Sequence, residues 1–173
     1  MRRISTLALI TTGLVALGCG AGSADDTAGS AAQGGDDAPA KTAKIGEPAR
    51  DGKFEFTVKS SKCGVAKVGS DLLGAKAQGQ FCLVTVNVKN IGKEAQMFDG
   101  SSQKAYDADG TEFSADNGAA IYANKDAETF LNDINPGNQV TGVVVFDIPK
   151  GVKLTKLELH DSPFSGGVDV TLG

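Results

Sequence analysis

The side chains with the greatest chemical potential in this sequence are three cysteines, Cys19, Cys63 and Cys82, and a single histidine, His160. Thiols and imidazoles bind metals or perform redox chemistry, but such sites need several of them at a defined spacing. A blue-copper centre and a Cys₂His₂ zinc site each require two histidines, and a thiol-redox site is typically a C-x-x-C motif, which is absent here. We therefore predict no metal ion. We interpret His160, beside Asp161 at the end of an expected strand, as a surface or hydrogen-bonded side chain.

Two short motifs that resemble catalytic or ion-binding sequences have simpler explanations. Residues 107–112 (Asp-Ala-Asp-Gly-Thr-Glu) look like part of a calcium loop, but the distal glutamate of such a loop is missing. A tight hairpin turn at Asp109-Gly110 is the preferred interpretation. Ser101 and Lys104 match S-x-x-K without its partner motifs, and the G-x-S-x-G, Walker and G-x-G-x-x-G motifs are absent. We predict no catalytic residue, no enzyme activity and no cofactor.

The amino-terminal residues have the pattern of an export signal. Met1-Arg2-Arg3 is followed by an uncharged apolar or small-residue run, 4–17, which is shorter than the roughly twenty residues of a membrane-spanning helix. The run ends in Val15-Ala16-Leu17-Gly18-Cys19, which resembles the lipobox of bacterial lipoproteins, although Ala16 stands where leucine is usual. Cys19 is therefore the expected lipid attachment site, and the alternative is ordinary cleavage after Gly18. The expected location is the outer face of a bacterial cell membrane, with the membrane contacted through lipidated Cys19.

Cys63 and Cys82 remain as an even pair if Cys19 carries lipid. Disulfides persist outside the cytoplasm, so we predict that these two residues form one. Cys82 shares a strand face with Val84 and Val86, which would place the bridge at the edge of the core. Closing a loop of about twenty residues contributes roughly 3 kcal/mol to stability. Two free, buried thiols are the alternative.

Composition divides the chain into a predicted signal peptide (1–18), a lipidated cysteine with a flexible tether (19–50) and a folded domain (51–173). Residues 20–48 contain one large aliphatic side chain, Ile45, and no aromatic residue, so this segment cannot bury enough surface to order itself. The formal net charge of −4 and the pI near 5.0 provide no basic excess for binding phosphates. We predict no nucleic-acid partner.

The folded domain alternates apolar and polar residues with a period of two, which is typical of half-buried strands. Phe54, Phe56 and Val58 define the first strand, and the run 139–148 is apolar on both faces at its centre, as in a central strand. The Asn-Pro-Gly-Asn sequence at 135–138 is suited to a type II turn. Further strands are expected at 81–89, 154–159 and 168–172. We predict an all-β fold, an immunoglobulin-like antiparallel β-sandwich of seven to eight strands.

Several segments of the domain resemble one known family. They are Val84-Thr85-Val86-Asn87-Val88-Lys89-Asn90-Ile91-Gly92-Lys93, Tyr106-Asp107-Ala108-Asp109-Gly110, Phe130-Leu131-Asn132-Asp133-Ile134-Asn135-Pro136-Gly137, Val140-Thr141-Gly142, Phe146 and Pro149. They resemble the telokin-like, immunoprotective-extracellular-type domain of unknown function on Gram-positive, especially actinobacterial, lipoproteins. The likeness extends from Gly52 to about Leu159. It implies an immunoglobulin-like sandwich outside the cell, and it carries over no catalytic residues.

The remaining evidence favours a binding function. The two longest expected loops each contain a pair of large apolar residues among polar neighbours, a composition typical of contact patches. These are Leu72 and Leu73 in the loop 64–80, and Ile121 and Tyr122 in the loop 114–128. The alternative is that these side chains plug the ends of the sandwich. We predict a domain that binds a protein or envelope component; the rival function is a small-molecule or ion carrier with a pocket between the sheets or under a loop.

Overall fold

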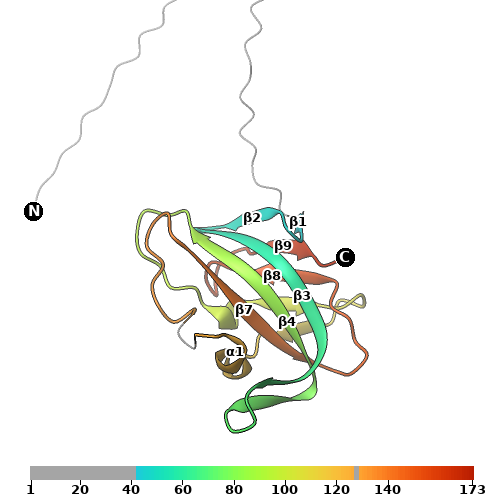
Figure 1. Ribbon diagram of the computed structural model, residues 1–173. Helices are drawn as coiled ribbons and strands as arrows, with labels where there is room; N and C mark the ends of the chain where they lie inside the picture. The colour runs from blue at the N-terminus through green and yellow to red at the C-terminus, as the bar shows by residue number, and fades with distance from the viewer. Residues whose placement is uncertain (1–41, 127–128) are drawn as a thin grey trace, which may run out of the picture. The chain divides into compact units, whose positions relative to one another are not determined.

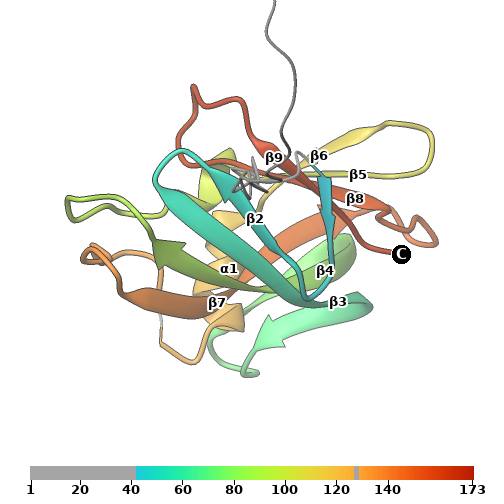
Figure 2. The ribbon, with the colours of Figure 1, turned by 90° about the horizontal axis from the view of Figure 1, so that it is seen from above.

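The computed structural model describes residues 42–126 and 129–173, so the predicted signal peptide and Cys19 lie outside the described residues. Two β-sheets pack face to face, with short helices in the connections (Figures 1 and 2). The elements are β1 (Thr42–Lys44), β2 (Pro48–Asp51), β3 (Phe54–Gly69), β4 (Gly74–Asn90), the 3₁₀ helix η1 (Gly100–Ser102), β5 (Lys104–Tyr106), β6 (Glu112–Ser114), α1 (Asn117–Ala123), β7 (Gln139–Ile148), β8 (Lys156–Leu159) and β9 (Val168–Thr171). No helix among the described residues has the length and hydropathy needed to cross a bilayer.

The sheets have the strand orders β1-β9-β8-β5-β6 and β2-β3-β4-β7. All neighbouring strands are antiparallel except β1 and β9, which are parallel. Alternate residues point inward, as the period of two requires, so Phe54, Phe56 and Val58 of β3 are fully buried. Leu157 of β8 and Val170 of β9 face them from the other sheet in the same core. The prediction of an all-β sandwich is confirmed.

The sandwich contains nine strands within the described residues, where the sequence predicts seven or eight, because it begins before the predicted boundary. Residues 42–50, expected in the tether, supply β1 and most of β2. Ala43 pairs with Val170 and is 4% exposed, and Ala49 pairs with Phe56 and is 0% exposed. A strand can join a sheet through backbone hydrogen bonds and small side chains, so the scarcity of large apolar residues does not prevent it. This corrects the predicted start of the folded domain at Asp51.

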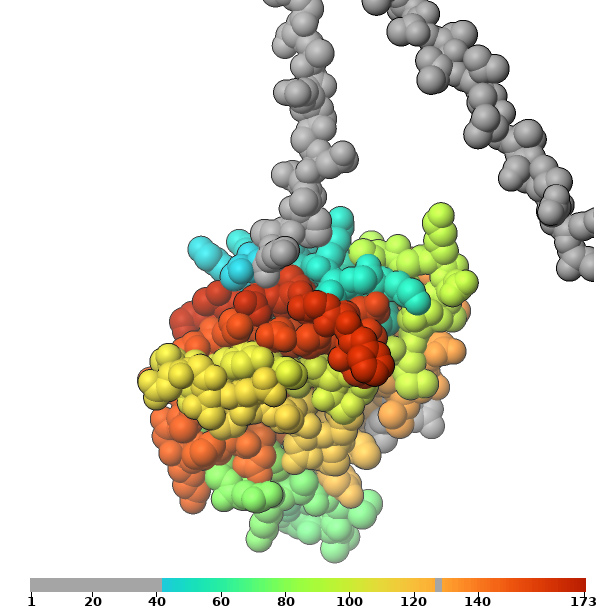
Figure 3. Space-filling model, turned by 180° about the vertical axis from the view of Figure 1, so that it is seen from behind, coloured from blue at the N-terminus to red at the C-terminus, as the bar shows by residue number. Residues whose placement is uncertain are grey.

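The first expected loop, 64–80, is instead an extension of the β3–β4 hairpin, and its turn lies at 70–73. The Asp147 carboxylate of β7 accepts the backbone N–H groups of Gln78 (2.6 Å) and Gly79 (3.1 Å) in the β4 half of this arm. A Cβ at Gly79 would stand 2.2 Å from the Ile148 carbonyl oxygen, so glycine is required there. The arm ends on the side of the domain opposite β1 and β2 (Figures 1 and 3).

The second expected loop, 114–128, contains α1. The Asp116 carboxylate accepts the backbone N–H of Ala119 at 2.9 Å and caps the helix, and the three alanines of the helix have high helix propensity. Ala119 is 2% exposed and packs with Val68, Phe81 and Val145 in a second apolar cluster, separate from the core between the sheets. Packing against β3, β4 and β7 therefore stabilises a helix that is too short to form alone.

Candidate functional site

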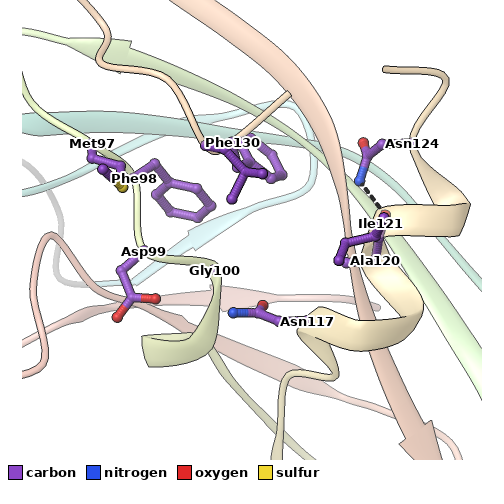
Figure 4. A pocket seen from close by; sticks show the side chains of 10 residues that line it. Met97, Phe98, Asp99, Gly100, Asn117, Ala120, Ile121, Asn124 and Phe130 are labelled. Carbon is purple, nitrogen blue, oxygen red and sulfur yellow. Dashed lines mark hydrogen bonds between the residues drawn. The ribbon is translucent and has the colours of Figure 1, made fainter. Parts of the chain in front are cut away.

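A hollow of about 220 Å³ lies beside α1 and is the candidate site (Figure 4). Three segments that are distant in the sequence form it: the chain before and into η1, helix α1, and the segment after the undescribed residues 127–128. Its lining residues are Met97, Phe98, Asp99, Gly100, Asn117, Ala120, Ile121, Asn124, Phe130 and Leu131. We call it the α1 hollow. Most of its exposed lining is apolar, which suits the burial of a hydrophobic group.

Phe98 and Phe130 form one wall of the α1 hollow, opposite Ala120 and Ile121 (Figure 4). The two rings meet edge to face with their centroids 4.7 Å apart. Phe98 is 1% exposed and also contacts two core phenylalanines of β3. Phe130 lies directly over Gly142 of β7, where an added Cβ would stand 2.4 Å from the Phe130 Cζ atom. The core and the bare backbone at Gly142 therefore hold this wall in position.

Three apolar side chains stand exposed at the rim of the α1 hollow. Met97 is 56% exposed, Ile121 47% and Leu131 59%. Scattered exposed apolar residues are normal on protein surfaces, but these three surround one apolar depression. A group entering the hollow would remove both the rim and the aromatic wall from water, which is the arrangement found at the centre of binding interfaces.

The polar groups at the α1 hollow differ in whether they are already hydrogen-bonded. The Asn124 side chain is fully engaged: its Oδ1 accepts the Val143 N–H at 2.7 Å, and its Nδ2 donates to the carbonyls of Val143 (3.0 Å) and Ala120 (2.8 Å). It therefore attaches the end of α1 to the outer edge of β7. By contrast, the side-chain amide of Asn117 makes no hydrogen bond within residues 42–126 and 129–173, and Asn117 is exposed.

Asp99 is the charged residue that lines the α1 hollow. Its Oδ1 accepts the backbone N–H and hydroxyl of Ser101 at 2.8 and 2.6 Å, and its Oδ2 accepts the Ser102 hydroxyl at 2.6 Å. Partial burial acts to raise the pKa of Asp99, but these hydrogen bonds outweigh it and leave the pKa below its ordinary value of 3.8. The carboxylate is thus fixed in orientation and negatively charged at neutral pH.

The structure brings the two predicted apolar pairs to neighbouring positions. Leu72 and Leu73 are 95% and 70% exposed at the tip of the β3–β4 hairpin, and Tyr122 is 41% exposed on α1. Tyr122 lies against the base of this tip. A Cβ added at Gly69 would stand only 3.1 Å from the Cβ of Tyr122. The alternative that these residues plug the sandwich ends is wrong for Leu72 and Leu73. The helix α1 presents Ile121 to the hollow and Tyr122 to the hairpin tip.

The predicted disulfide between Cys63 and Cys82 is present and lies at an irregularity in the β3–β4 pairing. Cys82 is buried with Val84 and Val86 in the core, whereas Cys63 is on the exposed side. The bridge thus joins the two long strands at the point where the ladder between Lys62 and Val65 is interrupted. The bridge therefore crosslinks two neighbouring strands of one sheet.

His160 follows β8 and is hydrogen-bonded, in agreement with its interpretation as a strand-end side chain. Its Nε2 lies 2.8 Å from the Glu158 carboxylate and its Nδ1 lies 3.3 Å from the Ser165 hydroxyl. Glu158 also accepts the Tyr106 hydroxyl at 3.1 Å. Within the described residues, no group of three or more His, Cys, Asp or Glu side chains is arranged to hold a metal ion. These contacts connect the β8–β9 loop to the sheet.

Fold and site together define a two-sheet β-sandwich with a side-chain-sized apolar hollow on its surface. Residues 43–170 match the family described as Domain of unknown function (DUF4352), and the chain belongs to that family. It is similar to the Uncharacterized protein YxkC of Bacillus subtilis, with 33% identity over 117 residues. That match covers 64% of this chain, and the chain spans only 64% of the length of the relative.

Two solved structures have a similar fold. The yjhA protein from Bacillus subtilis superposes with a TM-score of 0.55 at 18% identity and covers 76% of this chain and 99% of its own. The secreted protein MPT63 from Mycobacterium tuberculosis superposes with a TM-score of 0.53 at 20% identity and covers 75% of this chain and 92% of its own. At such identities the likeness shows the fold alone.

The α1 hollow is the feature that the sequence did not predict. Of its lining residues, only Ile121 was a predicted contact residue. One available signal was Gly142, a glycine inside an otherwise apolar strand, since such a glycine often marks the close approach of another group. The approaching group is the Phe130 ring, which packs against Phe98. These two phenylalanines are more than thirty positions apart in the sequence, so the tertiary structure decides which group approaches.

Proposed function

We propose that this chain is a cell-surface lipoprotein whose β-sandwich binds a partner protein or envelope component through the α1 hollow and catalyses no reaction. The partner inserts one apolar side chain into the hollow, against the Phe98 and Phe130 rings. Met97, Ile121 and Leu131 then cover the sides of that anchor and exclude water from it. The adjacent hairpin tip, with Leu72 and Leu73, extends the contact area.

The size of the hollow is the observation that carries the proposal. A cavity of about 150 Å³ holds one benzene ring, whereas sites for drug-sized ligands and cofactors occupy about 300–1,000 Å³. At about 220 Å³, the α1 hollow fits one aromatic or branched aliphatic side chain. Interfaces concentrate their binding energy in anchors of this kind, which enter a pocket at the centre of the contact. The volume favours a macromolecular anchor over a small-molecule carrier.

The proposed location rests on the leader and on the fold. The export-type leader and Cys19 lie outside the described residues, and the disulfide between Cys63 and Cys82 is of the kind that persists outside the cytoplasm. MPT63, which shares the fold, is a secreted protein. The described chain begins at β1, at the end of the domain opposite the hairpin tip (Figure 1). Anchoring through Cys19 would leave the α1 side of the domain free to meet a partner.

The experiment is chemical crosslinking on intact cells that express the full chain, comparing Leu131→Glu with Phe164→Glu. Both side chains are apolar and largely exposed, at 59% and 98%, so neither change should disturb folding. Leu131 borders the hollow, whereas Phe164 lies in the β8–β9 loop. Burying a carboxylate in the interface should weaken binding by at least about tenfold. We expect a crosslinked product of discrete mass that Leu131→Glu abolishes and Phe164→Glu retains.

Equal product from the native chain and from both variants would contradict the proposal, because it would show that the hollow does not contact the partner. The rival carrier function makes a different prediction: thermal stabilisation of the purified chain by a metabolite, with no crosslinked product on cells.

A further inference from the structure

Beyond its apolar lining, the α1 hollow has one fixed charge at its edge. Asp99 is oriented by the three hydrogen bonds from Ser101 and Ser102, so its carboxylate does not need to be immobilised when a ligand binds. Two of those bonds are accepted by Oδ1 and one by Oδ2. A carboxylate offers about four acceptor positions, which leaves Oδ2 able to accept a further donor.

The charge at the hollow is negative. Asp99 is the one charged residue among those that line it. Complementary charge steers association and disfavours partners of like charge. A partner with a positive charge beside its apolar anchor is therefore favoured over a neutral or an acidic one.

A neutral polar group is also available at the hollow. The Asn117 amide lies between Gly100 and α1 (Figure 4) and has no hydrogen-bond partner among the described residues. It offers both a donor and an acceptor, which matches the backbone of a bound polypeptide segment. The arrangement thus combines an apolar pocket, a fixed anion and an unused amide.

We infer that the α1 hollow recognises an apolar side chain that lies next to a positive charge, the charge pairing with the Asp99 carboxylate. This inference rests on the proposed function, because it names the chemistry of the anchor that the hollow receives. The partner segment is an aromatic or branched aliphatic residue flanked by lysine or arginine. The side-chain amide of Asn117 forms a hydrogen bond with the backbone of that segment.

Three small probes of similar shape test the charge preference: phenethylammonium, 2-phenylethanol and 3-phenylpropionate. Each is titrated into the full chain, and its dissociation constant is taken from the NMR shifts of the Gly100 and Asn117 backbone amides. Ligands of this size bind in the millimolar range. An exposed charge pair changes affinity by about two- to fivefold, so we expect the ammonium to bind that much more tightly than the alcohol, and the carboxylate most weakly.

Asp99→Asn is the variant that isolates the charge. Asparagine retains an oxygen that can accept the Ser101 N–H, so η1 keeps its cap. In Asp99→Asn, the preference for the ammonium over the alcohol should fall below about twofold, while the affinity for 2-phenylethanol stays unchanged. Asp109→Asn, which removes an exposed carboxylate at the β5–β6 turn, away from the hollow, should leave the order of the three probes as in the native chain.

The outcomes separate this inference from the proposed function. Equal binding of all three probes to the native chain, or an unchanged order in Asp99→Asn, would overturn the charge selection and leave an apolar anchor site intact. Absence of binding by all three would also overturn the inference. The crosslinking comparison of Leu131→Glu with Phe164→Glu then decides the proposed function independently, because it does not depend on the charge of the partner.

Discussion

Replacing Gly142 by alanine tests how the aromatic wall of the α1 hollow is held. The backbone at Gly142 does not have a positive φ, so alanine is allowed there and would by itself add about 0.5–1 kcal/mol of stability. The new Cβ, however, would stand 2.4 Å from Phe130 Cζ and 2.7 Å from Thr129 Cγ2. Overpacking of this kind costs about 1–3 kcal/mol. We expect a net loss of about 0.5–2 kcal/mol in the free energy of unfolding.

The same change is then made in a Phe130→Ala background. There the clash with the Phe130 ring is gone, and Thr129 can move into the space that the ring vacates. In that background Gly142→Ala should be neutral or stabilising by up to about 1 kcal/mol, which against the loss of about 0.5–2 kcal/mol gives a coupling energy of about 0.5–3 kcal/mol. Urea denaturation of the four proteins measures the cycle, provided that the m-values agree. Equal costs of Gly142→Ala in the two backgrounds would refute the packing of Phe130 on Gly142.

Three further predictions concern the disulfide, the anchor and the acid response. The double change Cys63→Ala and Cys82→Ala should lower the free energy of unfolding by roughly 3 kcal/mol. Thiol titration of the unmutated domain, denatured without a reducing agent, should find neither cysteine free, and a stoichiometric amount of free thiol would contradict the bridge. Cys19→Ser should release the chain from membranes into the medium or block its processing, so unchanged membrane retention would exclude lipidation. The pKa of Asp99 is lower in the folded chain than in the unfolded chain, where it is about 3.9. The ionised Asp99 carboxylate therefore stabilises the fold above the unfolded pKa, and this stabilisation is lost as pH falls through the folded pKa. The advantage of the native chain over Asp99→Asn in urea should therefore shrink below about pH 4; a constant difference from pH 6 to pH 2 would show that Asp99 has no such role.

Parts of this fold with strong local signals were predictable from the sequence. The strand at 139–148 is observed with the predicted bounds, as β7. The predicted turn at 135–138 closes with a hydrogen bond from Asn138 N–H to Asn135 carbonyl, and Gly137 has a φ of 80°. In these segments the apolar pattern and the turn residues specify the backbone locally.

The segments that sequence reasoning missed depend on tertiary contacts. The strands β1 and β2 contribute small side chains to the core, and the hairpin arm has few large apolar residues between Val68 and Phe81 beyond the exposed Leu72 and Leu73. Helix α1 is short and gains its stability from packing on the outer sheet face. The α1 hollow combines three such segments, so its residues carry no common spacing in the sequence.

Contact between the α1 hollow and a partner can be measured directly by placing a photoreactive amino acid at position 131 or at position 164 in the full chain on living cells. Irradiation followed by mass spectrometry identifies the partner residue that is joined to each position. We expect one partner at position 131, joined at or beside an apolar residue flanked by lysine or arginine, and no product of the same mass at position 164. The same product from both positions, or none from position 131, would contradict this expectation.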